Sequence, residues 1–262
     1  MKKIALSLIV AATLSACATP ETQLEQQAGL AVNWVQDSGE YKALSYQAFN
    51  FARIAFNNTQ VPEGRQKAVV VDLDETMVDN SAYAAWRIKN NRPFSQQDWT
   101  RWVNARQATA IAGAVEFNNY VNANGGKVFY VSNRLAKEEQ AATIENLQKL
   151  GFTGVDNESL LLKTNKSNKS IRFQQVQDRG YDIVLFIGDN LNDFGDTTYH
   201  KDNAQRRAFV DQNKQLFGTR FIVLPNPTYG DWESGMAKGY YSLTPKGRVE
   251  ARDKALRSWN GK

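Results

Sequence analysis

The chain has 262 residues, which is enough for one substantial hydrophobic core and a smaller accessory element. Hydrophobic residues make up 42% of it and charged residues 23%, so the composition excludes a fibrous or disordered protein. The formal net charge is +5, but the basic residues are scattered and form no long run, so we do not predict binding to a nucleic-acid polymer.

The N-terminal residues form a targeting signal. Lys2 and Lys3 precede an apolar stretch, 4–14, that is too short to span a bilayer, and small residues lead from it to Cys17. Residues 1–16 resemble a bacterial lipoprotein signal peptide, which implies that Cys17 is lipidated and becomes the mature N-terminus. Since Ala18 is not an aspartate, the resemblance also implies a lipid anchor in the outer membrane. The alternative is an ordinary secretory signal with an incidental cysteine.

Cys17 is also the only cysteine of the chain. The protein therefore has no intramolecular disulfide and no thiol nucleophile for chemistry, and its stability must come from its core.

Two helical regions are expected outside the main sheet. Residues 17–27 are polar and are predicted to be an unstructured tether. Residues 28–64 carry apolar side chains at helical spacing and end at Asn and Pro-Glu-Gly stop signals, which predicts a helical cap or side element. The tryptophan-rich insertion 81–109 is expected to contribute to the same cap.

The rest of the chain alternates short apolar runs with helical patterns. Strands are predicted at 68–73, 127–132, 183–187 and 220–224, and helices at 112–122, 137–150 and 169–179. This alternation predicts an α/β fold, a doubly wound, Rossmann-like parallel sheet with a small, mainly helical cap or side domain, built from residues 28–262.

Polar residues follow the predicted strands where ligands bind to such sheets. Asp72 and Asp74 close the first strand, Ser132 and Asn133 the second, and Asp189 and Asp193 follow the third. An isolated Asp-x-Asp can be a turn or a helix cap, but capping does not explain three strand ends that bring carboxylates or hydroxyls to one edge.

These motifs resemble those of the haloacid-dehalogenase (HAD) superfamily. Asp72-Leu73-Asp74-Glu75-Thr76, Ser132-Asn133-Arg134, Lys169, and Gly188-Asp189-Asn190 with Asp193 stand in the family's order. With the segment 226–233, they are similar to the class C (DDDD) bacterial lipoprotein acid phosphatases and 5′-nucleotidases. The third motif is the least defined, because Lys163 and Lys166 lie close to Lys169.

The resemblance implies a magnesium-dependent acid phosphatase that forms an aspartyl-phosphate. Asp72 would be the nucleophile, and Asp74 the acid that protonates the leaving oxygen and then the base that activates water. Mg²⁺ would bind Asp72, Asp189 and the main-chain carbonyl of Asp74, with Asp193 supporting its water ligands. Ser132, Asn133 and Lys169 would bind the phosphate.

Three aromatic residues are candidates for substrate binding. Trp99, Tyr229 and Trp232 could stack on a nucleobase or nicotinamide, or could serve only in packing. The resemblance favours nucleoside 5′-monophosphates and nicotinamide mononucleotide as substrates, and a homodimer. Two other functions stay open: a non-enzymatic surface lipoprotein that binds haem or a nucleotide, and a phosphotransferase.

Overall fold

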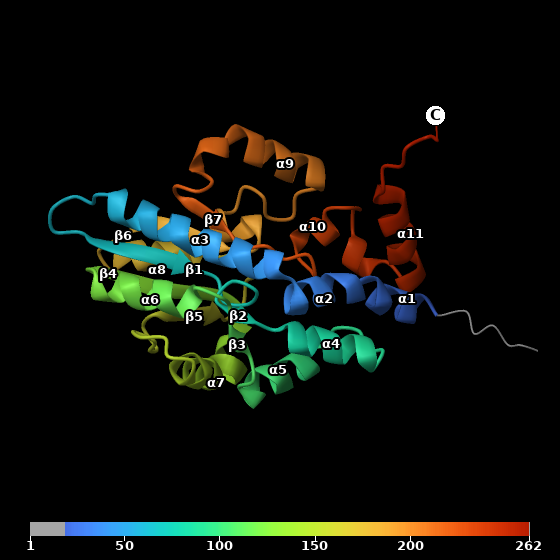
Figure 1. The fold of residues 1–262 in the computed structure, drawn as a ribbon, viewed down its shortest axis with the longest axis horizontal. Coiled ribbons are helices and arrows are strands. Elements are labelled where there is room, and N and C mark those ends of the chain that lie inside the picture. The colour runs from blue at the N-terminus through green and yellow to red at the C-terminus, as the bar shows by residue number, and fades with distance from the viewer. Residues whose placement is uncertain (1–18, 262) are drawn as a thin grey trace, which may run out of the picture.

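The computed structural model describes residues 19–261, and the predicted signal peptide and Cys17 lie outside the described residues. Five parallel strands form one sheet in the order β5-β4-β1-β6-β7 (Figure 1). The strands are β1 (Gln66–Val71), β4 (Gly126–Leu135), β5 (Leu160–Lys163), β6 (Tyr181–Gly188) and β7 (Phe221–Val223). The predicted α/β fold with a parallel sheet is therefore confirmed.

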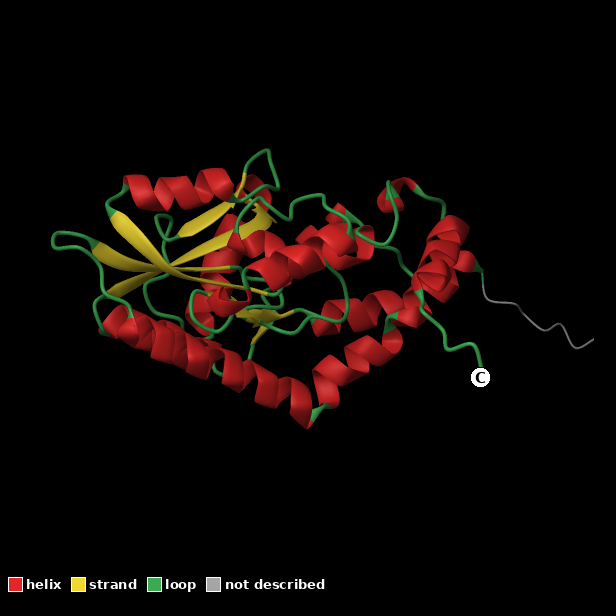
Figure 2. Ribbon diagram, turned by 90° about the horizontal axis from the view of Figure 1, so that it is seen from above, coloured by secondary structure: helices red, strands yellow, loops and turns green. Residues whose placement is uncertain are grey.

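Both faces of the sheet are buried, as the continuous apolar runs require. Along β1, Val69 and Val71 point into one core, while Ala68 and Val70 point into the other. The first core is closed by side chains of α3 (Gly39–Asn58), α6 (Ala114–Ala123) and α7 (Ala136–Lys149). The second is closed by α8 (Ser170–Asp178) and α9 (Asn203–Gln212), so that helices flank the sheet on two sides (Figure 2).

The remaining helices gather beyond the carboxyl ends of the strands (Figure 1). They are α1 (Pro20–Gln27), α2 (Gly29–Asp37), α4 (Ser81–Lys89), α5 (Gln96–Ala105), α10 (Asp231–Ser234) and α11 (Pro245–Ala255). A two-stranded antiparallel sheet pairs β2 (Val78–Asp79) with β3 (Thr109–Ala110), and α4 and α5 lie between these strands in the sequence. Three 3-10 turns complete the described chain: η1 (Leu191–Phe194), η2 (Lys214–Leu216) and η3 (Tyr240–Ser242).

The expectation of an unstructured tether is wrong for residues 20–27. The Thr19 side chain caps α1, Pro20 occupies its first turn, and Arg252 of α11 donates a 3.2 Å hydrogen bond to the Leu24 carbonyl. Because α11 lies at the other end of the sequence, the partner that stabilises this polar helix could not be recognised locally. Within residues 19–261, no helix combines the length and apolar character needed to cross a membrane.

Three strands also differ from the expectation. β5 was not predicted, since its four residues follow a turn-rich stretch and are too few to show a pattern. β2 and β3 have only two residues each, and they lie just before and at the end of the insertion 81–109 that was expected to be helical.

Candidate active site

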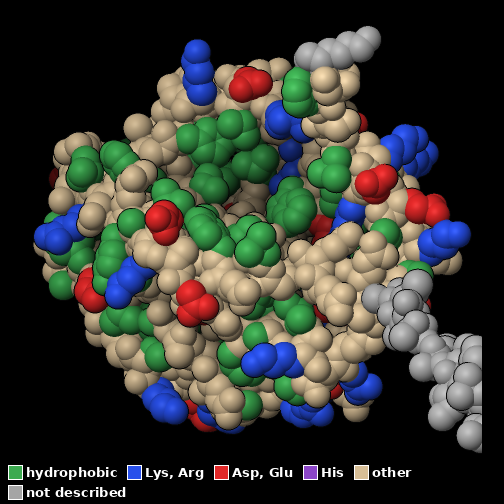
Figure 3. Space-filling model, turned by 45° about the vertical axis from the view of Figure 1, so that its right-hand side comes forward, with side chains coloured by type: hydrophobic (Ala, Val, Ile, Leu, Met, Phe, Trp, Pro, Cys, Tyr) green, Lys and Arg blue, Asp and Glu red, His purple; other side chains and the backbone are tan. Residues whose placement is uncertain are grey.

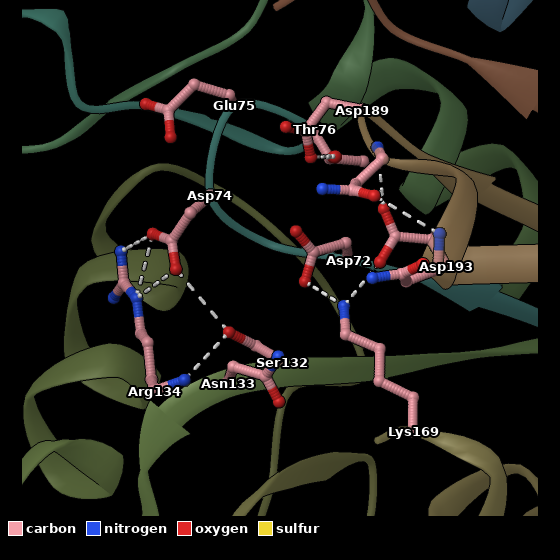
Figure 4. Close-up of polar contacts among 12 residues, drawn as sticks. Asp72, Asp74, Glu75, Thr76, Ser132, Asn133, Arg134, Lys169, Asp189 and Asp193 are labelled. Carbon is pink, nitrogen blue, oxygen red and sulfur yellow. Dashed lines mark hydrogen bonds and ion pairs between the residues drawn. The ribbon is translucent and has the colours of Figure 1, made fainter. Parts of the chain in front are cut away.

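The carboxyl end of β1 lies between β4 and β6, and β4 continues beyond it to Leu135. Val71, the last residue of β1, is paired with Tyr130 of β4 on one side and Ile187 of β6 on the other. The next residue, Asp72, donates its amide to the Ile187 carbonyl at 2.9 Å. The polar residues that follow β1 and β6 therefore converge on one site with those in the last part of β4, which include Ser132, Asn133 and Arg134, as Figure 4 shows.

Lys169 lies between two carboxylates at the centre of this site. Its Nζ atom is 2.5 Å from Asp72 Oδ1 and 2.7 Å from Asp193 Oδ1. Burial acts to lower the pKa of Lys169, but Asp193 and Asp72 raise it by more, so the ammonium stays charged. Lys163 is half-buried and Lys166 exposed, so the predicted residue Lys169 is the one that reaches the carboxylates.

Asp72 itself is placed where its charge is costly. Burial raises the pKa of Asp72 to about 7, against the opposing effect of Lys169 and with further increases from Asp193 and Asp74. A buried carboxylate in this position gains from any added positive charge.

A group of three aspartates could hold a cation. Asp72, Asp189 and Asp193 each offer a carboxylate oxygen, and these oxygens lie within 4.8 Å of one another. The pKa of Asp189 is well above its ordinary value because of burial, and then because of Asp193 and Asp72. One ammonium does not balance three closely spaced carboxylates, of which Asp193 is buried and the other two are half-buried, so a hard divalent cation with oxygen ligands fits the group.

The outer members of this group are fixed by hydrogen bonds. Asp189 accepts from Thr76 Oγ1 at 3.1 Å and from Asn226 Nδ2 at 2.8 Å. Asp193 uses one oxygen for Lys169 and the other for the Asn190 amide at 2.9 Å. Both oxygens of Asp193 thus have protein partners, which suits the predicted supporting role better than direct ligation.

Asp74 points away from Asp72 and toward Arg134 (Figure 4). Arg134 Nη2 lies 2.7 Å from Asp74 Oδ1, Asn80 Nδ2 donates to the same oxygen at 3.0 Å, and Ser132 Oγ is 3.4 Å from Oδ2. The Asp74 carboxylate lies outside the three-aspartate group.

Arg134 is a site residue to which the sequence analysis assigned no role. Its side chain is buried and donates a further 3.0 Å hydrogen bond to Thr143 Oγ1. Burial acts to lower the pKa of Arg134, but Asp74, together with Glu139 and Glu75, more than offsets this effect. Its place directly after Ser132 and Asn133, at a strand end, was the available signal.

Ser132 and Asn133 are held by a second buried arginine. Arg172 Nη1 donates to the Ser132 carbonyl at 2.5 Å, and Nη2 donates to Asn133 Oδ1 at 2.7 Å. Ser132 is buried, whereas Asn133 is exposed at the end of the strand. The two predicted phosphate-binding side chains thus differ in their access to solvent.

The three predicted aromatic residues lie in two places. Tyr229 lies in the loop that leads into α10, and Trp232 lies in α10. They are 42% and 39% exposed and are linked by a 3.2 Å hydrogen bond from Trp232 Nε1 to the Tyr229 carbonyl. Trp99 is half-buried on α5, where its ring packs edge-on against Tyr83 at 5.3 Å. Figure 3 shows a hollow on one face of the molecule, rimmed by apolar side chains and with basic side chains inside.

Glu75 is another buried carboxyl that the sequence analysis did not single out. It accepts hydrogen bonds from the Tyr229 hydroxyl and, at 3.0 Å, from the Asn80 amide. Burial, followed by the charge of Asp74, raises the pKa of Glu75 to about 8.

A model of the HAD superfamily, subfamily IIIB (acid phosphatase), matches residues 4–232. The chain belongs to this family. The family predicted from the motifs is thus confirmed, and it places the chain among phosphoric monoester hydrolases. HAD phosphatases generally use a divalent metal, which agrees with the three-aspartate group.

Solved structures of the same family are similar along nearly the whole chain. The class C acid phosphatase of Bacillus anthracis is 34% identical, with a TM-score of 0.86 over 91% of this chain and 100% of its own. A second structure of a class C acid phosphatase from Bacillus anthracis, with tungstate bound, is 32% identical, with a TM-score of 0.84.

Plant relatives are more distant. Acid phosphatase 1 of Solanum lycopersicum is 28% identical over 131 residues, which are 47% of this chain and 50% of the tomato protein. The match thus spans only half the length of that relative. A stem 31 kDa glycoprotein of Glycine max is 26% identical over 206 residues, 76% of this chain and 70% of the soybean protein.

Proposed function

We propose that this protein is a magnesium-dependent acid phosphatase that hydrolyses phosphate monoesters through an aspartyl-phosphate on Asp72. The observation that carries the proposal is the position of the Asp72 carboxylate, 2.5 Å from the buried ammonium of Lys169 and within the three-aspartate group. Tungstate is a tetrahedral oxyanion, as phosphate is, so its binding to the relative from Bacillus anthracis supports an oxyanion site in this fold.

The cation, when bound by Asp72 and Asp189, would neutralise charge on the phosphate dianion. An Asp72 oxygen attacks phosphorus while the bond from phosphorus to the leaving oxygen breaks, and Asp74 gives its proton to that oxygen. Water then attacks phosphorus, Asp74 takes a proton from it, and the bond between Asp72 and phosphorus breaks. Asp72 and Asp74 both return to their starting states.

The other predicted residues hold the transferred group and the two aspartates. Lys169 offsets negative charge beside Asp72, and Ser132 and Asn133 donate hydrogen bonds to the phosphoryl oxygens. Arg134 orients the Asp74 carboxylate through two adjacent donors. The first step needs Asp74 in its protonated form, so the proposal favours an acidic rate optimum.

The finer proposals rest on the family and on the exposed aromatic rings. Nucleoside 5′-monophosphates and nicotinamide mononucleotide carry flat leaving groups that Trp99, Tyr229 or Trp232 could stack on. A lipid on Cys17, an outer-membrane location and a homodimer complete the proposal. Such an enzyme would release nucleosides outside the inner membrane.

The test is phosphate release from a nucleoside 5′-monophosphate between mildly acid and neutral pH, with Mg²⁺ or with a chelator. Asp72→Asn should abolish the release, and Asp211→Asn, which changes an exposed aspartate of α9, should retain it. No release from any monoester by the folded, Mg²⁺-loaded protein would contradict the proposal and favour a ligand-binding lipoprotein. Phosphorylated product on addition of a nucleoside acceptor would identify phosphotransfer.

A further inference from the structure

The loop that carries Tyr229 forms hydrogen bonds to the site at the carboxyl ends of the strands through two of its side chains. Asn226, near its start, donates to the Asp189 carboxylate at 2.8 Å and accepts from the Thr228 amide at 2.9 Å. Three residues further on, the Tyr229 hydroxyl donates to Glu75. The loop therefore contacts the segment that follows β6 through one side chain and the segment that follows β1 through the other.

Glu75 has features that structural packing alone does not require. It follows Asp74 directly, is 5% exposed, and has a φ of 58°, a conformation that is uncommon for a residue with a side chain. Within residues 19–261, no ion pair involves Glu75, and its two oxygens accept from the uncharged donors Asn80 and Tyr229. Burying a carboxyl without a cation is costly, so its retention calls for a role.

Tyr229 is fixed at one end and open at the other. Its hydroxyl reaches the buried Glu75, while the residue as a whole is 42% exposed. The tyrosine oxygen lies on the axis about which the ring turns, so a hydrogen bond at the hydroxyl fixes the position of that axis. Because the O–H bond prefers the plane of the ring, the acceptor also favours one orientation of the ring about the axis. The Trp232 indole donates to the Tyr229 carbonyl at 3.2 Å and restrains the backbone of the same residue.

We propose that Glu75 is a positioning residue that gives the site its selectivity for monoesters with a flat aromatic leaving group. It holds the Tyr229 ring in a set position relative to Asp74, which precedes Glu75 in the chain. A base would then stack on a ring that is already in place and would not have to order it, which lowers the cost of binding. This inference rests on the proposed phosphatase function.

The test compares two substrates that differ only in the aromatic group, adenosine 5′-monophosphate and ribose 5-phosphate. The quantity measured is the ratio of their kcat/KM values, which cancels any general loss of activity. Tyr229→Phe keeps the ring and removes the hydroxyl, and Glu75→Ala removes its partner. Each should lower the ratio by about tenfold, or about 1.4 kcal/mol, mainly through the KM of the nucleotide, because the base then stacks on a ring that is not held in place.

Two further variants separate positioning from general support. Glu75→Gln retains one acceptor for the Asn80 amide and one group that can bond the Tyr229 hydroxyl, so it should keep most of the wild-type ratio. The double variant Glu75→Ala, Tyr229→Phe should lower the ratio no further than either single variant, because both remove one interaction.

The inference is overturned if Tyr229→Phe leaves the ratio at its wild-type value, or if the two single effects multiply in the double variant. Tyr229→Phe changes one exposed residue, so this test stands even if Glu75→Ala does not fold. Failure of the wild-type protein to release phosphate from both substrates would instead contradict the proposed function.

Discussion

The carboxyl ends of the central strands, called the sheet edge here, and the segment 225–233 have different roles in the site. At the edge, buried charged groups lie in contact, as Lys169 does with Asp72 and Asp193. On the segment 225–233, the aromatic side chains are exposed, and the few polar ties hold the backbone and the end of one ring. The charged residues proposed for catalysis thus lie at the ends of strands. The aromatic residues proposed for substrate binding lie on a segment whose conformation depends on hydrogen bonds to other parts of the chain.

The comparison predicts that the largest effects follow changes to charge at the sheet edge. Lys169→Met leaves Asp72 and Asp193 facing each other without a cation, so kcat/KM should fall by about 10³-fold and the metal-free protein should lose about 3 kcal/mol of stability. Phosphate release and thermal unfolding measure the two effects.

Added Mg²⁺ should raise the Tm of Lys169→Met by more than it raises that of the wild type, because the cation replaces part of the lost charge. Lys166→Met removes an exposed lysine from the same connection and is the matched control. Equal losses of activity in the two variants would show that the position of the Lys169 ammonium beside Asp72 does not determine its contribution to activity.

A smaller effect is expected where one charged side chain orients another. Arg134→Ala removes the paired donors that hold Asp74. First-turnover release of the alcohol from an alkyl phosphate, whose leaving oxygen needs a proton, should fall by about 10²-fold, while first-turnover release of 4-nitrophenol from 4-nitrophenyl phosphate should fall much less. An equal loss of first-turnover release for both substrates would mean that Arg134 does not act through the acid role of Asp74.

Packing at the edge gives the next effect in size. A Cβ atom on Gly188 would lie 2.1 Å from Asp193 Oδ2, so Gly188→Ala must displace the carboxylate that accepts from Lys169. We expect a loss of about 1–3 kcal/mol of stability together with reduced activity. Gly39→Ala, at a helix start with no atom within 4 Å, should leave both properties near wild type. Denaturant titration with an activity assay distinguishes the two variants.

Local sequence patterns were sufficient for the sheet edge. Asp72, Ser132 and Asp189 each follow an apolar run of strand length, and parallel topology brings such ends together whatever the intervening chain does. Lys169 follows no apolar run of strand length. Its place in the site was predicted only from the order of the family's motifs.

The ties between distant segments could not be predicted in this way. Glu75 and Tyr229 are 154 positions apart, and Arg252 and Leu24 are 228 positions apart. Such contacts depend on how the loops and outer helices pack against the sheet. The spacing of residues within either segment does not indicate which residue the other segment supplies. For the same reason α1 was mistaken for a tether.

The smallest effect on activity is expected from changes in the outer helices. There α11 contacts α1 and also α10, which follows the loop that carries Tyr229. Arg252 of α11 contacts Glu233, the Tyr240 hydroxyl at 2.7 Å and the carbonyl of Leu24. Arg252→Ala should lower stability by about 1–2 kcal/mol. The nucleotide KM should rise a few fold with kcat retained, because the loop loosens while the edge does not change.

Arg65→Ala is a matched control for Arg252→Ala. It removes a partly exposed ion pair with Asp182 at the opposite end of the strands and should cost less than 1 kcal/mol without changing KM. A drop in kcat for Arg252→Ala would contradict the separation of edge and loop. Steady-state kinetics and thermal unfolding give both readouts.

The central claim, covalent catalysis by Asp72, is tested most directly by trapping the intermediate. Asp74→Asn removes the base that activates water, while 4-nitrophenyl phosphate needs no acid to expel its leaving group. Brief reaction of this variant with that substrate and Mg²⁺, acid quenching and peptide mass analysis should find one phosphoryl group on the peptide that contains Asp72. Release of 4-nitrophenol with an equal amount of free phosphate, and with no phosphorylated peptide at any time, would contradict the mechanism.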